Sequence, residues 1–198
     1  MKTKSFKYVL SIGLLIVSMV SFAASSPVDM LQQATDQMLQ SLKKTENRNT
    51  QSLYRLVQNI LLPHVDLDRM SQLVVGRYWA QASPADRQEF KQQFTYYVTR
   101  TYSTALSSYT NEKVRFFPIR GGVSGNRVQV NSSIDQSNGQ NISVSYRLLN
   151  NNGNWKVYDF TVEGVSMVDN YRSQFADILR TQGLAGLNQR LQSRNGKK

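Results

Sequence analysis

The chain has 198 residues and a formal net charge of +11 at neutral pH, from 24 Lys and Arg against 13 Asp and Glu. It contains no cysteine, which excludes disulfides, thiolate metal sites and cysteine nucleophiles. A phosphate-binding loop of the form G-x-x-x-x-G-K-S/T or G-x-G-x-x-G is also absent from the sequence, which removes the usual signatures of nucleotide-dependent enzymes.

Residues 1–23 are predicted to form a cleavable export signal. Three lysines lie among the first seven residues, the stretch from Val9 to Val20 is mostly apolar but too short to span a bilayer, and small residues follow up to Ala24. Lipidation would require a cysteine at the cleavage point. We therefore expect residues 24–198 to be a free, soluble protein exported to the periplasm, with a net charge of about +8.

The first half of residues 24–198 is predicted to be helical. Apolar residues recur at helical spacing over residues 28–44, and again from residue 49 to the position before Pro63. Asp66 is placed to cap a third helix, which we expect to reach Trp79 with an interruption at Gly76.

The clearest helix start is Ser83-Pro84, where a capping serine and a first-turn proline are followed by Asp86. The helix that follows carries a long stripe of aromatic and aliphatic residues at four-residue steps, from Phe90 to Leu106. Most such stripes pack an ordinary core. Periodicity alone does not separate core residues from residues that line a ligand cavity.

After Tyr109 the period of the apolar residues changes to two, which is typical of strands. Four strands are predicted, around residues 114–116, 128–132, 142–148 and 155–162. The segments between them are rich in Gly and Asn, as tight turns require, so we expect an antiparallel meander.

The last predicted strand carries large apolar side chains on both of its faces. Trp155 and Val157 share one face, and Tyr158, Phe160 and Val162 share the other. We therefore expect helices or bound apolar matter to cover more of this sheet than usual.

The C-terminal segment is predicted to be helical from residue 166, broken at Gly183, and frayed from about residue 193. No linker and no internal repeat divides residues 24–198, which indicates one domain. The predicted class is α+β, with several helices around a four-stranded, largely antiparallel twisted sheet.

His64 is the only histidine, and it stands close to Asp66 and Asp68. One imidazole and two carboxylates on one short loop are too few ligands for a zinc cage, and Asp66 already has a role as a helix cap. No nucleophile elbow of the form G-x-S-x-G is present. We predict neither a catalytic residue nor a metal site, and we expect no cofactor.

The positive charge favours anionic partners. We expect no nucleic acid, because an exported protein rarely meets it and the basic residues are scattered rather than clustered. Anionic lipid headgroups or acidic proteins suit the expected compartment better. The charge could also serve only to keep the protein in solution.

Several segments together resemble the MlaC family of periplasmic phospholipid-binding proteins, also known as toluene-tolerance or ABC-transport auxiliary components. Their order and spacing, over residues 28–191, make the set specific. The segments are residues 61–65 (LLPHV), 74–79 (VVGRYW), 83–90 (SPADRQEF), 154–159 (NWKVYD), 163–168 (EGVSMV) and 179–183 (LRTQG). Family members often carry tyrosine where this chain has His64.

The resemblance implies a cone-shaped α+β fold in which a small sheet and helices enclose an apolar pocket. It also implies a carrier that shuttles phospholipid between an outer-membrane lipoprotein–porin complex and an inner-membrane ABC lipid transporter with a substrate-binding ring. Such transport would maintain the lipid asymmetry of the outer membrane. No cofactor follows from the resemblance; the bound phospholipid is the ligand.

Elementary physical chemistry supports a carrier with a dry interior. A diacyl lipid has on the order of 30 methylenes, so at roughly 0.8 kcal/mol each its free passage through water would cost about 20 kcal/mol or more. A protein that lowers this cost needs an apolar slot, with polar groups only at its mouth.

The residues that we expect to form this slot come from the helical stripe, the strands and the turn near residue 165. The predicted acyl-chain residues are Leu73, Val74, Tyr78, Phe94, Val98, Tyr102, Leu106, Val144, Tyr146, Trp155, Val157, Phe160, Val162, Val165, Met167 and Val168. Arg77, Arg100 and Arg147 are predicted to lie near the headgroup, although each could equally be an ordinary surface arginine.

Two other classes of function stay open from the residues alone. One is a small exported enzyme, because α+β scaffolds host unrelated activities and paired carboxylates can meet in a fold without leaving a sequence motif. The other is an adaptor that binds protein partners through its basic surface.

Overall fold

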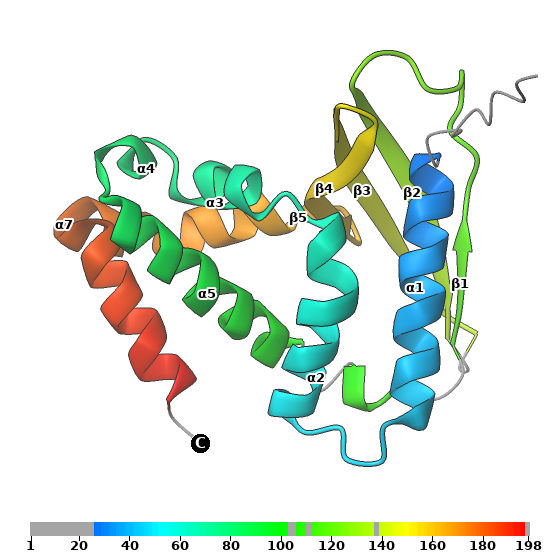
Figure 1. The fold of residues 1–198 in the computed structure, drawn as a ribbon, viewed down its shortest axis with the longest axis horizontal. Helices are drawn as coiled ribbons and strands as arrows, with labels where there is room; N and C mark the ends of the chain where they lie inside the picture. The colour runs from blue at the N-terminus through cyan, green and yellow to red at the C-terminus, as the bar shows by residue number, and fades with distance from the viewer. Residues whose placement is uncertain (1–25, 103–105, 110–111, 137–138, 197–198) are drawn as a thin grey trace, which may run out of the picture.

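The computed structural model describes residues 26–102, 106–109, 112–136 and 139–196. A group of helices lies beside an antiparallel sheet, and one long helix, α1, covers the sheet (Figure 1). The predicted α+β class is confirmed. The predicted export signal, residues 1–23, lies outside the described residues.

The helices follow the predicted order along the chain. Their bounds are α1 Pro27–Lys44, α2 Thr50–Leu56, the π-helical turn η1 Val57–Leu61, the 3₁₀ turn η2 Leu62–His64, α3 Leu67–Val75, α4 Tyr78–Gln81, α5 Pro84–Thr101 and α7 Met167–Asn195.

Side-chain caps fix where several of these helices begin. The carboxylate of Asp66 accepts from the backbone N–H of Arg69 at 2.9 Å, and the hydroxyl of Ser83 accepts from the N–H of Asp86 at 3.1 Å. Both caps satisfy donors that the first helical turn leaves unpaired. The two predicted caps are therefore confirmed.

The interruption predicted at Gly76 is confirmed, and one later helix ends earlier than the sequence predicts. Gly76 adopts φ 63°, ψ −136°, so α3 stops there and residues 78–81 form the separate helix α4. Helix α5 ends at Thr101, and residues 103–105, in the middle of the expected extension to Leu106, are outside the described part of the chain.

Contacts with α5 hold the last turn of α7. The break at Gly183 is confirmed, since this residue has non-helical dihedral angles inside α7. Helix α7 continues to Asn195, past residue 193, from about which the sequence predicts fraying. The amide of Asn195 donates to the carbonyl oxygen of Gln93 at 3.0 Å, and the guanidinium of Arg100 donates to the last carbonyls of the helix.

The sheet has five antiparallel strands among the described residues, not four, in the order β1-β2-β3-β4-β5. Their bounds are β1 Lys113–Phe116, β2 Arg127–Asp135, β3 Asn141–Asn151, β4 Asn154–Val162 and β5 Val165–Ser166. Strand β5 pairs Val165 with Val162 after a tight turn at Glu163 and Gly164, both at positive φ. Two residues are too few to show a period of two, which is why the sequence does not reveal this strand.

A β-bulge in β4 changes the predicted faces of the sheet. Leu148 pairs with Val157, and the next residue back along β3, Arg147, pairs with Asp159, so Tyr158 is the extra residue. Tyr146 then pairs with Phe160, on the same face as Leu148 and Val157. Assigning Val157 and Phe160 to opposite faces was therefore wrong.

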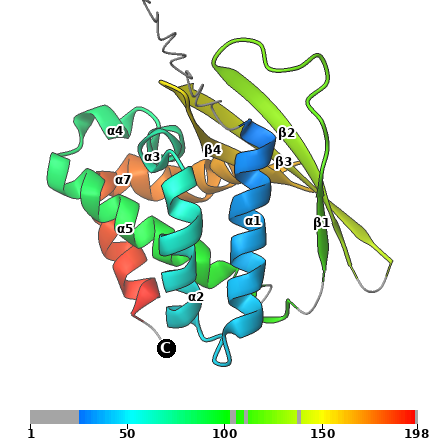
Figure 2. The same ribbon diagram turned by 45° about the vertical axis from the view of Figure 1, so that its right-hand side comes forward.

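The sheet consequently has one apolar face and one polar face. Val130 and Leu148 are fully buried on the apolar face, beneath Met30 and Leu31 of α1. The opposite face is more polar: Ser145 donates to the side chain of Asn131 at 2.8 Å. Figure 2 shows α1 lying along the sheet, with the other helices beyond it.

We expect Gly183→Ala to destabilise the protein by about 1–3 kcal/mol, because φ 66°, ψ −166° is a region that essentially only glycine adopts. Denaturant unfolding measures the loss. Gly196→Ala is the matched control, since Gly196 has φ −78° and the new methyl group would meet only ordinary contacts. Equal losses in the two variants would contradict the assignment of strain to Gly183.

Candidate functional site

The elements close into a ring around the middle of the molecule. Strand β4 packs against α3 and α7, α7 packs against α5, α5 packs against α2, and η1 packs against α1, which contacts β1 and β2. Figures 1 and 2 both show α2 standing between α5 and α1.

Buried apolar residues form three separate clusters at the contacts of this ring. The first joins α3, α4, α5 and α7 around residues such as Phe90 and Phe175. The second joins α1 to the sheet around Leu148, and the third joins α1 to α2 and η1 around Leu42 and Leu53. The described apolar residues thus do not merge into one central core.

Large apolar side chains on the same elements remain only partly buried. These side chains pack against the three clusters and keep part of their surface accessible. The set, drawn from α2, η1, α5 and the sheet and its neighbouring segments, is Leu56, Val57, Leu61, Val65, Val98, Tyr102, Leu106, Tyr146 and Phe160.

The predicted acyl-chain residues divide by burial. Seven are buried within the fold: Val74, Phe94, Val144, Trp155, Val157, Met167 and Val168. Eight are partly buried: Leu73, Tyr78, Val98, Tyr102, Leu106, Tyr146, Phe160 and Val162. Val165 lies apart from both groups, 56% exposed at the outer strand β5. Contact of these residues with acyl chains stays a prediction.

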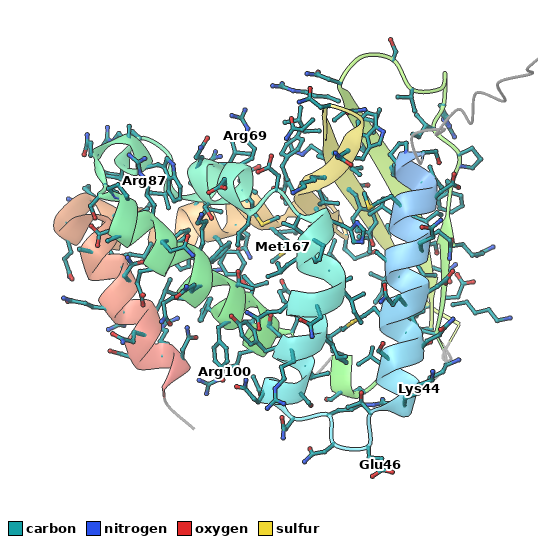
Figure 3. All side chains as sticks on the ribbon, viewed as in Figure 1. Lys44, Glu46, Arg69, Arg87, Arg100 and Met167 are labelled. Carbon is teal, nitrogen blue, oxygen red and sulfur yellow. The ribbon has the colours of Figure 1, made fainter. Side chains whose placement is uncertain are left out.

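Tyr102 and Met167 connect two of the walls. The hydroxyl of Tyr102, at the end of α5, donates to the sulfur of Met167, the first residue of α7, at 3.2 Å. Figure 3 shows Met167 near the middle of the view, between α3 and α2. Burial raises the pKa of Tyr102 and of Tyr146, so both phenols are neutral at physiological pH.

The three predicted headgroup arginines have separate surroundings. Arg77 is exposed; its guanidinium donates to the hydroxyl of Tyr78 at 2.9 Å and lies over that ring. Arg100 donates to the carbonyls that end α7. Arg147 pairs with Asp159 on the neighbouring strand. The contacts of Arg100 and Arg147 are structural, and a headgroup role for any of the three stays a prediction.

A buried carboxylate joins the sheet to the helices. The side chain of Asp159 on β4 is 1% exposed. Its oxygens accept from the guanidinium of Arg147, from the hydroxyl of Ser166 at 2.7 Å, and from the backbone N–H of Val168 at 3.1 Å. These bonds offset the cost of burying the charge and fix the first turn of α7 on β4.

His64 is half-buried in η2, against β4. Burial and the nearby charge of Lys156 lower its pKa, which favours the neutral imidazole. The two neighbouring carboxylates are engaged elsewhere, because Asp66 caps α3 and Asp68 pairs with Lys91 at 2.8 Å. Within the described residues no group of three or more metal-ligating side chains is arranged to hold an ion.

Two open grooves lie on the surface. One, of about 450 Å³, runs between the end of α3 and the middle of α7 and is lined partly by the predicted residues Val74, Arg77 and Tyr78. The other, of about 490 Å³, lies between α1 and β1. Neither is lined by Val98 or Phe160, so the predicted internal pocket stays a prediction.

Across the described ranges, no helix combines the length and the apolar character needed to span a membrane.

Comparison with known proteins shows the family of this chain. The family model described as MlaC protein matches residues 32–193. The intermembrane phospholipid transport system binding protein MlaC of Haemophilus influenzae is 30% identical over 183 residues, which cover 89% of this chain and 86% of that protein. The chain belongs to the MlaC family.

Two further similarities agree with this MlaC assignment. The toluene tolerance protein ttg2D of Pseudomonas putida is 30% identical, covering 86% of this chain and 83% of that protein. A phospholipid-binding protein from Ralstonia solanacearum, solved in complex with a phospholipid, superposes with a TM-score of 0.81 and 31% identity. The match covers 86% of this chain and 97% of that one. The resemblance stated from the sequence is confirmed.

The sequence analysis missed Asp159 and Ser166 of this MlaC chain. A signal for Asp159 was present, because it stands in a predicted strand that has large apolar side chains on both faces. A carboxylate that is buried in such a strand needs a partner. Its partners come from β3 and from the start of α7, and no sequence spacing reveals them.

We expect Asp159→Ala to lower the free energy of unfolding by about 2–3 kcal/mol, because the N–H of Val168 and the guanidinium of Arg147 lose a charged acceptor. Urea unfolding gives the value. Asp177→Ala, which removes an exposed pair with Arg180 on the same helix α7, should change stability little. If Asp159→Ala changed the free energy of unfolding only a little, the bonds of Asp159 to Ser166 and Val168 would not be what holds α7 on β4.

His64 should make the folded protein less stable in mild acid. The unfolded imidazole titrates near pH 6.5 and the folded one at lower pH, so the unfolded state binds more protons and stability falls as the pH drops below about 6.5. In His64→Gln the loss of stability between about pH 7.5 and about pH 5 should be smaller than in the parent. If the free energy of unfolding of both proteins depended on pH in the same way, folding would not lower the pKa of His64.

Proposed function

We propose that this protein is a periplasmic phospholipid carrier that holds acyl chains in the middle of its ring of helices and strands. The observation that carries the proposal is the Ralstonia solanacearum relative, which has the same fold over 97% of its length and was solved with a phospholipid bound. The partly buried apolar side chains described above supply the matching chemistry in this chain.

The acyl chains would complete the interior that the side chains leave unfilled. Val98 and Tyr102 on α5 and Tyr146 and Phe160 on the sheet have surface that hydrocarbon could cover. Each methylene that moves from water into such a slot contributes about 0.8 kcal/mol. Hydrocarbon that lies between the three separate apolar clusters would leave their existing packing intact.

The carrier acts between two membranes. The Haemophilus influenzae relative is named for an intermembrane phospholipid transport system. We propose that this chain exchanges lipid with an inner-membrane ABC lipid transporter through its substrate-binding ring, and with an outer-membrane lipoprotein–porin complex, and so maintains outer-membrane asymmetry. Residues 1–23 would direct its export and then be removed.

Transport of this kind needs no bond-breaking step, and we propose that the protein is not an enzyme. The required work is to exclude water from the acyl chains while the headgroup stays solvated. Neutral tyrosines such as Tyr102 and Tyr146 suit the border between the two environments, because each has an apolar ring and a polar hydroxyl.

We expect Val98→Asp to reduce co-purified phospholipid by about tenfold or more, because an unpaired carboxylate would border the acyl chains. Organic extraction of the protein purified from cells, followed by mass spectrometry, gives the lipid per protein. Val98 is preferable to Val168, which is buried beside the carboxylate of Asp159, where a second carboxylate would disturb the fold.

Gln92→Asp is the matched control, since it places the same charge on an exposed position of the same helix and should retain lipid. Circular dichroism on both variants separates loss of lipid from loss of fold. A folded Val98→Asp variant with its full lipid content would contradict the proposed cavity. An empty parent protein that hydrolyses or transfers acyl groups would support an enzyme instead.

A further inference from the structure

The connection between β1 and β2, residues 117–126, presents apolar side chains to solvent. Phe117 is 45% exposed and Val123 is 49% exposed. Single exposed apolar residues are ordinary on protein surfaces. Here, however, two of the three large apolar side chains that are exposed among the described residues lie in one short connection.

The base of this connection is anchored. Phe116 and Ile119 pack against the cluster between α1 and the sheet. The backbone N–H of Phe117 donates to the carbonyl oxygen of Asn131 on β2 at 2.9 Å. The backbone at Phe117 is therefore held by the fold, while its side chain stays exposed.

The same region is basic. Residues 113–134 contain four Lys or Arg and no Asp or Glu. Arg115 pairs with Asp135 at 3.0 Å. Arg120 and Arg127 are exposed, and neither forms an ion pair with a carboxylate in the described part of the chain.

The connection also lies at an extremity of the molecule. Figures 1 and 2 show it extending beyond the ends of β2 and β3, at the end of the sheet where α1 begins. Gly121, Gly122 and Gly125 all have positive φ with nothing near them, so its tip has little bulk of its own.

We propose that residues 117–126 contact the surface of an anionic phospholipid bilayer. Phe117 and Val123 enter the border between headgroups and acyl chains, while Arg120 and Arg127 lie among the phosphates. A bilayer suits this connection better than a protein partner does, because isolated apolar tips flanked by cations need no complementary shape. This contact goes beyond the proposed carrier function and does not depend on the central cavity.

Vesicle co-sedimentation of the purified full protein tests the proposal. We expect binding to vesicles of phosphatidylglycerol and phosphatidylcholine, and about tenfold weaker binding to phosphatidylcholine alone. The double variant Phe117→Ser/Val123→Ser removes the apolar tips, and Arg120→Gln/Arg127→Gln removes the charges. Each should weaken binding to the mixed vesicles by about tenfold, because both kinds of contact contribute.

Arg55→Gln/Arg190→Gln is the matched control, since it removes two exposed arginines elsewhere and should leave binding within about twofold of the parent. Co-purified lipid should stay unchanged in both loop variants, which separates this contact from the carrier function. The proposal is overturned if the parent does not prefer anionic vesicles, if either loop variant binds as the parent does, or if the control loses as much binding as Arg120→Gln/Arg127→Gln. Loop variants that impair only binding to a protein partner would likewise overturn it.

Discussion

The bonds to the buried carboxylate of Asp159 join the two halves of this protein. Through Arg147 they link two strands, and through Ser166 and Val168 they fix the start of α7. Helix α7 in turn carries the largest of the three apolar clusters. This polar junction and the three apolar clusters together hold the helices against the sheet.

A ring held together at its contacts, with separate apolar clusters, suits a protein that takes up hydrocarbon. A single tightly packed core would leave no place for acyl chains without a large cost in lost packing. Here the clusters and the junction at Asp159 stabilise the ring, and side chains such as Val98 and Phe160 remain only partly buried. The Ralstonia solanacearum relative, which has a similar fold, was solved in complex with a phospholipid.

Features that depend on a few adjacent residues were predictable from the sequence. The caps at Asp66 and Ser83 and the break at Gly183 follow from local hydrogen bonding and backbone freedom. The bulge at Tyr158 was not predictable, because no residue type marks it and it is defined by pairing with β3. For the candidate site, the sequence identified the types of residue but not which of them pack and which remain open. That distinction depends on how distant elements approach one another.

The most direct measurement is a crystal structure of the protein purified from cells without removal of bound lipid. We expect elongated density for two acyl chains in the middle of the ring, in contact with Val98 and Tyr102 on one side and with Tyr146 and Phe160 on the other. A middle filled by the protein's own side chains, with no hydrocarbon between α5 and the sheet, would contradict the claim that phospholipid is held there.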